Sequence, residues 1–426
     1  MKNKGTANIC AAVLACIFIL AGCGNGNQVV NYEETDRESI TLTFFGNKYE
    51  PENVLIIEEI ISDFMKENPG IRISYESLKG NAYYNALEKR MAAGKGDDVF
   101  MVNHDILLEL KNQGLVADLS GLGTISNFTE SMRGQMEEDG RIYWVPTTVS
   151  IFGLYCNLDL LKEHNQKVPE NLGEWMAACE YFAGQGITPV IANNDISLKT
   201  LVIGRGFYSL YQEKREKEVF SSLNSGEEAL SDYLEPGFLL VKEMIDKGYV
   251  DAKKTVETRK TSDDLQEFTK GEAPFMLTGA WAAGRVDGMK PDFLFEVIPY
   301  PVLEDGSLLV INADTRLSVN AGSEHKEEAM KFVEFFTKPE NISKFADQQS
   351  SFSPLEGGEP SSVKEIQTLI PCYQQGRTVI GTDAFLEVPI WNLTAQAVQK
   401  LLAGEPEETV MDWLDEQAGE ERGAEG

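Results

Sequence analysis

The amino-acid sequence predicts an α/β protein that is built from two α/β units. Three observations support this prediction: short apolar strands alternate with amphipathic helices over residues 40–113, the alternation restarts at residue 151, and the chain is 426 residues long. Such alternation is typical of a parallel or mostly parallel sheet. A chain of this length is also more easily accommodated in two cores than in one.

The first unit is predicted from six elements in a row, each with the periodicity of its type. The predicted strands are residues 40–45 (ITLTFF), 71–75 (IRISY) and 99–102 (VFMV). The predicted helices are residues 54–65, 83–93 and 106–113. Glycine-containing segments at 68–70, 94–96 and 114 follow these helices, and glycine commonly marks the end of a helix.

The alternation that restarts at residue 151 gives a longer series of elements. Its expected strands are residues 151–156, 188–192, 274–277, 295–299, 308–311 and 316–319. Its expected helices are residues 172–183, 235–247, 263–270, 326–336, 393–402 and 409–413. The last residues, from 415 to 426, are acidic and rich in glycine, so we expect them to be frayed.

The N-terminus has the parts of an export signal. Lys2 and Lys4 supply positive charge, and residues 9–21 form an apolar run of about 13 residues, which is too short to span a bilayer. The run ends in Leu20-Ala21-Gly22-Cys23, which resembles a bacterial lipobox. We therefore expect a lipoprotein signal peptide at 1–22, lipidation such as palmitoylation at Cys23 and a flexible tether at 23–37. The alternative is an ordinary signal peptide in which Cys23 has no role.

Charge and cysteine content exclude some classes of protein. The formal net charge is −30, and an acidic surface of this size repels nucleic acid. Of the six cysteines, Cys156, Cys179 and Cys372 lie beyond the expected N-terminal signal and anchor, and no Cys-x-x-Cys spacing occurs among them. We interpret these three as small buried thiols.

Common catalytic and metal-binding motifs are absent from the sequence. It contains neither Gly-x-Gly-x-x-Gly nor a Walker-type loop, and its three histidines, His104, His164 and His325, stand far apart. A metal site and a cofactor are therefore not expected. Ser361-Ser362-Val363-Lys364 fits Ser-x-x-Lys, but no Lys-Thr-Gly follows it, and we interpret it as a helix N-terminus. A carboxylate pair of the glycosidase type stays open, because spacing cannot reveal which acidic residues meet.

Several strings, taken in order, resemble the extracellular solute-binding proteins of ABC sugar importers, the family 1 group that contains maltose-binding protein. They are residues 68–73 (NPGIRI), 98–105 (DVFMVNHD), 114–119 (GLVADL), 143–157 (YWVPTTVSIFGLYCN), 268–273 (FTKGEA) and 279–281 (GAW). Together they span nearly all of the chain after the tether. The resemblance implies a periplasmic-binding-protein-like fold of two α/β lobes with discontinuous segments and a hinge. We place lobe 1 at 38–147 and 306–355, lobe 2 at 148–305 and 356–415, and an acidic tail at 416–426.

Two tryptophans are the first candidates for ligand contact, because sugars offer apolar faces to flat aromatic rings. Trp281 follows small residues at a strand end and matches the stacking tryptophan of the family. Its alternative is a core tryptophan. Trp391 precedes a helix and matches a second stacking position, with helix packing as an equally weighted alternative. Val102 stands where maltose-binding protein has a tryptophan, so we expect a ligand other than maltodextrin.

Polar candidates lie near the ends of the first strands. Asp105 matches the hydroxyl-binding aspartate of the family, and helix capping is its alternative unless Asn103 or His104 takes that place. Asn103 and His104, which directly precede it, are themselves candidates for ligand contact. Asn47 follows the first strand, where the family has polar contacts. Asp314 and Arg316 lie near a lobe crossing, and they are expected either to contact ligand or to form an ion pair.

These observations favour a monomeric, lipid-anchored receptor that captures a carbohydrate, in particular an oligosaccharide, between two lobes and delivers it to an ABC permease in the membrane. Closure around the ligand requires no bond to be made or broken, so no enzyme activity is expected. Two alternatives remain: a secreted glycan-degrading lipoprotein, and a receptor of the same fold for another solute such as a peptide or polyol.

Overall fold

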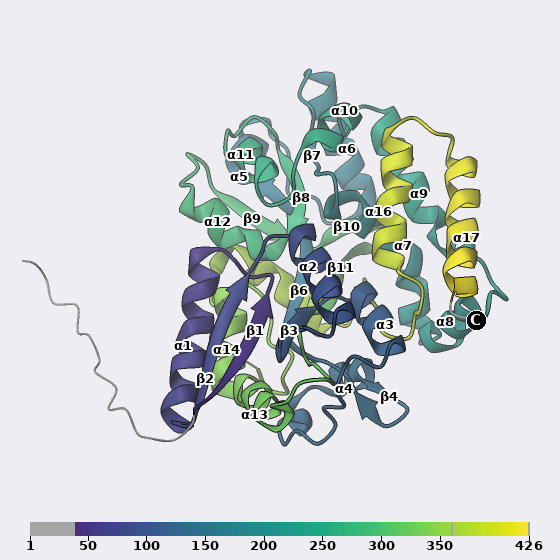
Figure 1. Ribbon diagram of the computed structural model, residues 1–426. Coiled ribbons are helices and arrows are strands. Elements are labelled where there is room, and N and C mark those ends of the chain that lie inside the picture. The colour runs from purple at the N-terminus through teal and green to yellow at the C-terminus, as the bar shows by residue number, and fades with distance from the viewer. Residues whose placement is uncertain (1–38, 359–360, 425–426) are drawn as a thin grey trace, which may run out of the picture. The chain divides into compact units, whose positions relative to one another are not determined.

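One mixed sheet positions the rest of the chain. The computed structural model describes residues 39–358 and 361–424, and within them ten strands join this sheet, while a separate two-stranded hairpin lies outside it (Figure 1). The path through the sheet is β2-β1-β3-β11-β6-β8-β7, and β9, β10 and β12 pair with its long central strands. The expected signal peptide, Cys23 and the whole of the tether lie outside the described residues.

The strands agree closely with the periodicity of the sequence. Those of the main sheet are β1 (Ile40–Gly46), β2 (Ile71–Ser77), β3 (Val99–Val102), β6 (Val145–Asn157), β7 (Val190–Ile191), β8 (Phe275–Gly279), β9 (Phe295–Ile298), β10 (Tyr300–Leu303), β11 (Gly306–Val319) and β12 (Thr378–Ile380). The hairpin pairs β4 (Glu137–Glu138) with β5 (Arg141–Ile142). β1 runs parallel to β2 and β3, as the βα alternation predicts.

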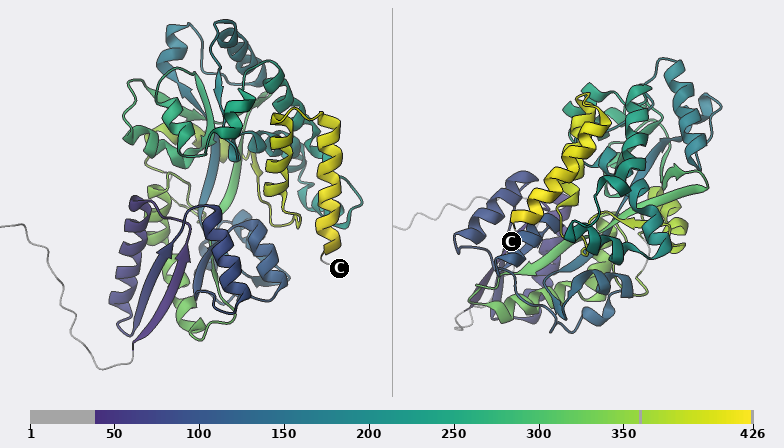
Figure 2. Two further views of the ribbon diagram at one scale, coloured as in Figure 1. Left: turned by 45° about the horizontal axis from the view of Figure 1, so that its top comes forward. Right: turned by 90° about the vertical axis from the view of Figure 1, so that its right-hand side faces the viewer.

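Two long strands, β6 and β11, lie in the middle of the sheet and belong to both of its portions. One portion contains β1, β2 and β3, and the other contains β7, β8, β9, β10 and β12. They pair with each other in antiparallel fashion from Val310 with Phe152 to Leu317 with Val145. One end of β11 also pairs with β3, whereas the other end pairs with β10 and β12. β6 continues past this region to pair with β8 and β9. Figure 2 shows the two strands running from the part that holds α1 into the part that holds the teal helices.

Helices flank both portions of the sheet. They are α1 (Pro51–Glu67), α2 (Asn81–Ala92), α3 (His104–Asn112), α4 (Glu130–Met136), α5 (Leu158–Glu163), α6 (Leu172–Gly184), α7 (Ile196–Glu213), α8 (Glu216–Ser225), α9 (Ser231–Asp246), α10 (Ala252–Glu257), α11 (Asp263–Phe268), α12 (Ala283–Gly288), α13 (Lys326–Phe336), α14 (Pro339–Gln348), α15 (Ile370–Gln374), α16 (Ile390–Leu402) and α17 (Glu407–Ala424). Short 3-10 helices lie at η1 (Ile125–Asn127), η2 (Ala280–Ala282) and η3 (Lys364–Leu369).

Buried apolar residues form two clusters. The first core includes side chains of β1, β3, α1, α3, α4 and α13. The second core includes side chains of α6, α7, α8, α9, α16 and α17. Trp281 packs at the edge of both clusters. The lobe boundaries expected at 147/148 and 305/306 fall within β6 and at the start of β11, and they stay a prediction.

Three expectations about individual elements were wrong. The strands expected at 308–311 and 316–319 are one strand, β11, because the polar residues between them continue the pairing with β6. The frayed tail is instead the second half of α17, whose Leu414 and Ala418 are buried in the second core. Several helices were also not predicted from the sequence, namely α4, α5, α7, α8, α10, α12, α14 and α15. Ser361-Ser362-Val363-Lys364, by contrast, leads into η3 as a helix N-terminus should.

Candidate binding site

Phe152 brings the two candidate tryptophans together. Its ring, on β6, lies 5.1 Å from the ring of Trp281 in an edge-to-face arrangement and 5.4 Å from the ring of Trp391, measured between centroids. Trp281 and Trp391 are 110 positions apart in sequence, and both are half-buried. The two indoles therefore belong to one aromatic cluster.

Trp281 owes its position to the glycine at the end of β8. A Cβ atom at Gly279 would lie 2.2 Å from atoms of the Trp281 ring, which is far inside van der Waals contact. The chain then turns through η2, whose neighbours Ala280 and Ala282 are buried. The run of small residues thus leaves space for the indole beside the strand end.

Trp391 lies in the first turn of α16 and is covered on one side by a buried lysine. The Nζ atom of Lys199, on α7, lies 4.3 Å from the centroid of the Trp391 ring, a distance suited to a cation–π contact. A Cβ atom at Gly381 would lie 2.9 Å from this ring, so glycine leaves space there too. The ring is held by packing, which fits the helix-packing alternative, and it remains half-buried rather than enclosed.

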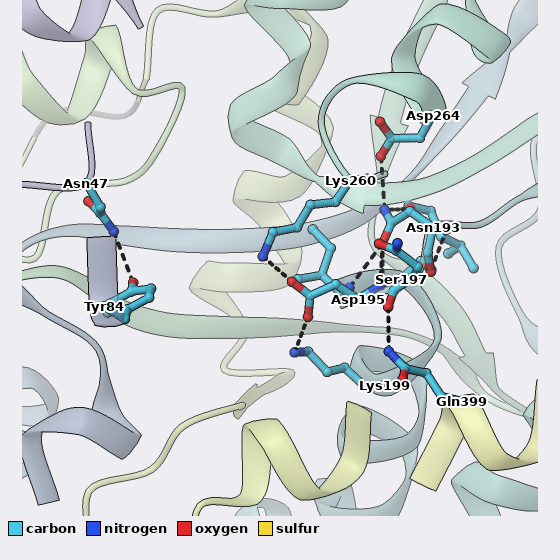
Figure 3. Close-up of polar contacts among 12 residues, drawn as sticks. Asn47, Tyr84, Asn193, Asp195, Ser197, Lys199, Lys260, Asp264 and Gln399 are labelled. Carbon is cyan, nitrogen blue, oxygen red and sulfur yellow. Dashed lines mark hydrogen bonds and ion pairs between the residues drawn. The ribbon is translucent and has the colours of Figure 1, made fainter. Parts of the chain in front are cut away.

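Lys199 was not a candidate in the sequence analysis. In the structure its side chain is only 1% exposed. It pairs with Asp195 at 2.6 Å, one helical turn earlier, and Lys260 pairs with the other oxygen of the same carboxylate (Figure 3). Burial lowers the pKa of Lys199 to about 8, against the opposite effect of Asp195. Burial would raise the pKa of Asp195, but the two lysines hold it well below its usual range.

Asn103, and not Asp105, caps helix α3. The Asn103 side chain accepts from the backbone N–H of Ile106 at 2.9 Å, so the capping alternative for Asp105 is wrong. Asp105 is buried, and its Oδ1 atom has no hydrogen-bond partner in the described part of the chain. Burial raises its pKa to about 6, while Lys199 and a hydrogen bond from the Asn392 backbone act in the opposite direction.

Asn47 and Tyr84 form a second polar group, which Figure 3 shows apart from the Asp195 cluster. The Asn47 amide donates to the Tyr84 hydroxyl at 3.0 Å, and Asn47 Oδ1 is buried without a partner among the described residues. Burial raises the pKa of Tyr84, as do the nearby charges of Asp314 and Asp105. Burial lowers the pKa of the neighbouring Lys48, which the sequence did not indicate as a candidate.

His104 makes a defined contact that the sequence did not indicate. Its Nε2 atom lies 3.0 Å from the carbonyl oxygen of Leu386, so Nε2 carries the proton and donates. Burial, together with the charge of Arg316, lowers the pKa of His104 to about 3. The ring is therefore neutral at physiological pH.

Asp314 and Arg316 lie on β11 where the two sheet portions meet, and no ion pair joins them in the described ranges. The Ser150 hydroxyl donates to Asp314. Arg316 is 2% exposed, donates to the carbonyl oxygens of Ala313 and Thr382, and lies 3.9 Å from the centroid of the Trp144 ring. Its Nη1 atom has no partner among the described residues. Thr315 between them has φ +45°, a left-handed value that is unusual for a β-branched residue.

The cluster offers both flat rings and unused polar atoms. Seven side-chain atoms in residues 39–358 and 361–424 are buried without partners, and three of them belong to candidate residues: the acceptors Asn47 Oδ1 and Asp105 Oδ1 and the donor Arg316 Nη1. Buried polar atoms normally find a partner, so each of these atoms is available to a polar ligand. Two hollows, of about 250 and 680 Å³, are lined by other residues. The space for a ligand at this cluster stays a prediction.

Two further features of the described ranges bear on function. They contain no group of His, Cys, Asp and Glu side chains arranged to hold a metal ion. None of their helices is long and apolar enough to cross a membrane. The cysteines at 156, 179 and 372 are free and buried, as the sequence predicts.

Solved structures with a similar fold are binding proteins. RafE in complex with raffinose superposes with a TM-score of 0.72 and 24% identity, covering 90% of this chain and 100% of RafE. A sugar transporter protein of Bacillus licheniformis in complex with stachyose gives a TM-score of 0.66 and 22% identity, covering 89% of this chain and 99% of that chain. The chain therefore has the two-lobed α/β fold of solute-binding proteins.

The sequence comparison places this fold in a family. The chain belongs to the bacterial extracellular solute-binding proteins, whose family model matches residues 59–365. The multiple sugar-binding protein of Streptococcus mutans is 23% identical over 362 residues, which make up 82% of this chain and 83% of that protein. Family and fold agree with the resemblance found in the sequence.

Proposed function

We propose that this solute-binding protein is the substrate-binding component of an ABC transporter, and that it captures a carbohydrate between its lobes and delivers it to a membrane permease. The observation that carries the proposal is the cluster of Trp281, Trp391 and Phe152 near buried polar atoms without partners. Aromatic rings suit the apolar faces of a sugar, and the unpartnered atoms suit its hydroxyl groups.

Comparisons with known proteins support a saccharide of several units. The similar structures hold raffinose and stachyose, and a maltodextrin-binding protein of Bacillus subtilis is 25% identical over 302 residues. The proposed ligand contacts are Trp281, Trp391, Asp105, Asn47, Asn103 and Asp314. They would bind the ligand without making or breaking a bond, and the protein would act as a monomer without a cofactor.

The proposed location is the outer face of the bacterial membrane. Leu20-Ala21-Gly22-Cys23 supports a lipid anchor on Cys23, after removal of residues 1–22. These residues lie outside the described part of the chain. Mass spectrometry of the processed N-terminus tests the anchor, because a diacylated cysteine would be its first residue.

A thermal-shift screen tests the ligand class. A panel of raffinose, stachyose, maltotriose, chitin oligosaccharides, polyols and peptides should give a positive shift only with saccharides. A ligand at 100 times its Kd adds roughly 2.7 kcal/mol to the free energy of unfolding, which is readily measured. A shift only with peptides or polyols would contradict the proposal.

Two controls sharpen this screen. Trp281→Ala should abolish the shift while the unliganded protein remains folded, and unaltered binding would remove Trp281 from the site. Incubation with the saccharide that binds should leave that saccharide intact. Product in excess of the protein concentration would instead support the glycan-degrading alternative.

A further inference from the structure

Residues 381–389, called the strap here, lead from β12 to α16 and end two positions before Trp391. No helix or strand is assigned within these residues. Their backbone groups are instead held by side chains that come from two different sets of elements. The strap therefore has a defined position that depends on tertiary contacts.

One set of contacts comes from elements of the first core and its strand β11. Arg316 donates to the carbonyl oxygen of Thr382 at 3.1 Å. The side-chain oxygen of Gln135, on α4, accepts from the backbone N–H of Ala384 at 2.8 Å. His104, at the start of α3, donates to the carbonyl oxygen of Leu386 at 3.0 Å.

The other set comes from helices of the second core. The Tyr211 hydroxyl, on α7, donates to the Asp383 carboxylate at 2.6 Å. Asn224, on α8, donates to the carbonyl oxygen of Phe385 at 2.8 Å and accepts from the backbone N–H of Glu387 at 2.9 Å. The backbone groups of residues 382, 384 and 386 thus bond to the first set, and those of residues 385 and 387 bond to the second. The Asp383 carboxylate bonds to Tyr211 of the second set and to Gln135 of the first.

We propose that the strap fixes the position of Trp391, and that His104 and Gln135 are positioning residues for this tryptophan rather than ligand contacts. Both side chains are buried, at 3% and 5% exposure, and each holds one strap backbone group, through His104 Nε2 and through Gln135 Oε1. His104 adjoins Asp105, so the same turn of α3 holds the strap and carries a proposed ligand contact. A relative movement of the two cores must release one set of strap contacts.

Fluorine NMR of the ligand-free protein, labelled with 5-fluorotryptophan, tests this proposal. The five tryptophans give one signal each, and Trp391→Phe identifies the signal of residue 391. In His104→Ala and in Gln135→Ala we expect the Trp391 signal to shift or broaden, while the Trp175 and Trp413 signals stay unchanged. His104→Gln, whose amide can donate to the same carbonyl oxygen, should restore the wild-type signal.

His164→Ala is the matched control, because His164 contacts Tyr181 and not the strap. An unchanged Trp391 signal in both His104→Ala and Gln135→Ala would overturn the proposal. If one of these two variants fails to fold, the Trp391 signal of the other variant still tests the proposal. The signal is measured without ligand, so the result is independent of whether the protein binds a saccharide.

The effect on affinity rests on the proposed function. With the saccharide found by thermal shift, loss of the His104 hydrogen bond should weaken binding about fivefold, as for a typical hydrogen bond of about 1 kcal/mol. Hydrogen–deuterium exchange of the Ala384 amide in Gln135→Ala provides a second, ligand-free readout. Unchanged affinity combined with a displaced Trp391 signal would contradict the proposal that Trp391 contacts the ligand. It would still support the proposal that the strap positions Trp391.

Discussion

Gly279 shows how a single residue determines the geometry of the aromatic cluster. The indole of Trp281 occupies the space where any other residue would place its Cβ atom, at 2.2 Å from ring carbons. A contact that short forces either the ring or the backbone to move. The absence of a side chain at position 279 is therefore required for the observed position of the Trp281 indole.

We predict that Gly279→Ala weakens ligand binding at least tenfold, which corresponds to about 1.4 kcal/mol, because it displaces Trp281 from Phe152. Isothermal titration calorimetry measures the change in Kd. Gly284→Ala is the control, since a Cβ atom there would lie 3.6 Å from Ser350 Oγ, an ordinary contact. Equal affinities in Gly279→Ala and wild type would show that the indole position does not matter for binding.

Asp105 gives the stability a pH dependence of defined sign. Its pKa is about 6 in the folded protein against a usual value of 3.8, so between these values the folded state binds more protons than the unfolded chain. The free energy of unfolding therefore falls as pH rises through this window, by up to about 3 kcal/mol, and the loss is complete above the folded pKa.

We predict that Asp105→Asn removes this loss. The variant should gain stability relative to wild type as pH rises from about 4 to 7, by up to about 3 kcal/mol. Urea denaturation at a series of pH values measures this difference. The same substitution at the exposed Asp412 is the control for the change of side chain. A constant difference between Asp105→Asn and wild type across the series would exclude a raised pKa.

Trp281 and Asp105 could be identified as candidates from the sequence, whereas Lys199 could not. Trp281 and Asp105 follow apolar strands, and a strand end is recognisable from the run of residues before it. Lys199 was missed because it lies on α7, where buried residues surround the helix and remove the periodic pattern. The one available signal was Asp195, four positions earlier, because this spacing brings two charges together on a helix.

Among the helices and strands, too, some bounds could be predicted from the sequence and others could not. The periodic apolar residues of α13 predicted its bounds at 326–336, and the structure confirms them. β11 was divided in the prediction because Asn312 and Asp314 interrupt its apolar run. Their side chains are satisfied by Thr382 and Ser150, which are distant in sequence, and such partners cannot be recognised from local pattern.

The C-terminal helix α17 offers a test at this scale. Truncation after Trp413 removes the buried Leu414 and Ala418 and the hydrogen bonds from Ser231 to Asp415. We predict a loss of about 3 kcal/mol or more in the free energy of unfolding, chiefly from the lost apolar burial. Chemical denaturation measures it.

Truncation after Arg422 provides the comparison, because it retains these contacts and the hydrogen bond from Arg422 to the Leu223 carbonyl oxygen. This second truncation should leave the denaturation midpoint unchanged. A similar midpoint for both truncated proteins would mean that α17 contributes little, as the expectation of a frayed tail implied.

At the scale of the whole molecule, the shared strands β6 and β11 join the two cores. Neither sheet portion is complete without them, because β3 pairs with one end of β11 while β8 pairs with β6. We predict a single cooperative unfolding transition, with a ratio of calorimetric to van't Hoff enthalpy close to one. Differential scanning calorimetry measures it, and two resolved transitions would indicate lobes that unfold independently.

Thr315 lies in β11 between Asp314 and Arg316, both of which pair with β6. A β-branched residue held at positive φ stores on the order of 1–3 kcal/mol. The Thr147 hydroxyl donates to the Thr315 carbonyl oxygen at 2.9 Å and helps to keep this conformation. A rotation of one lobe against the other that returned Thr315 to extended backbone would release this energy, and it would thereby favour the rotated arrangement of the lobes.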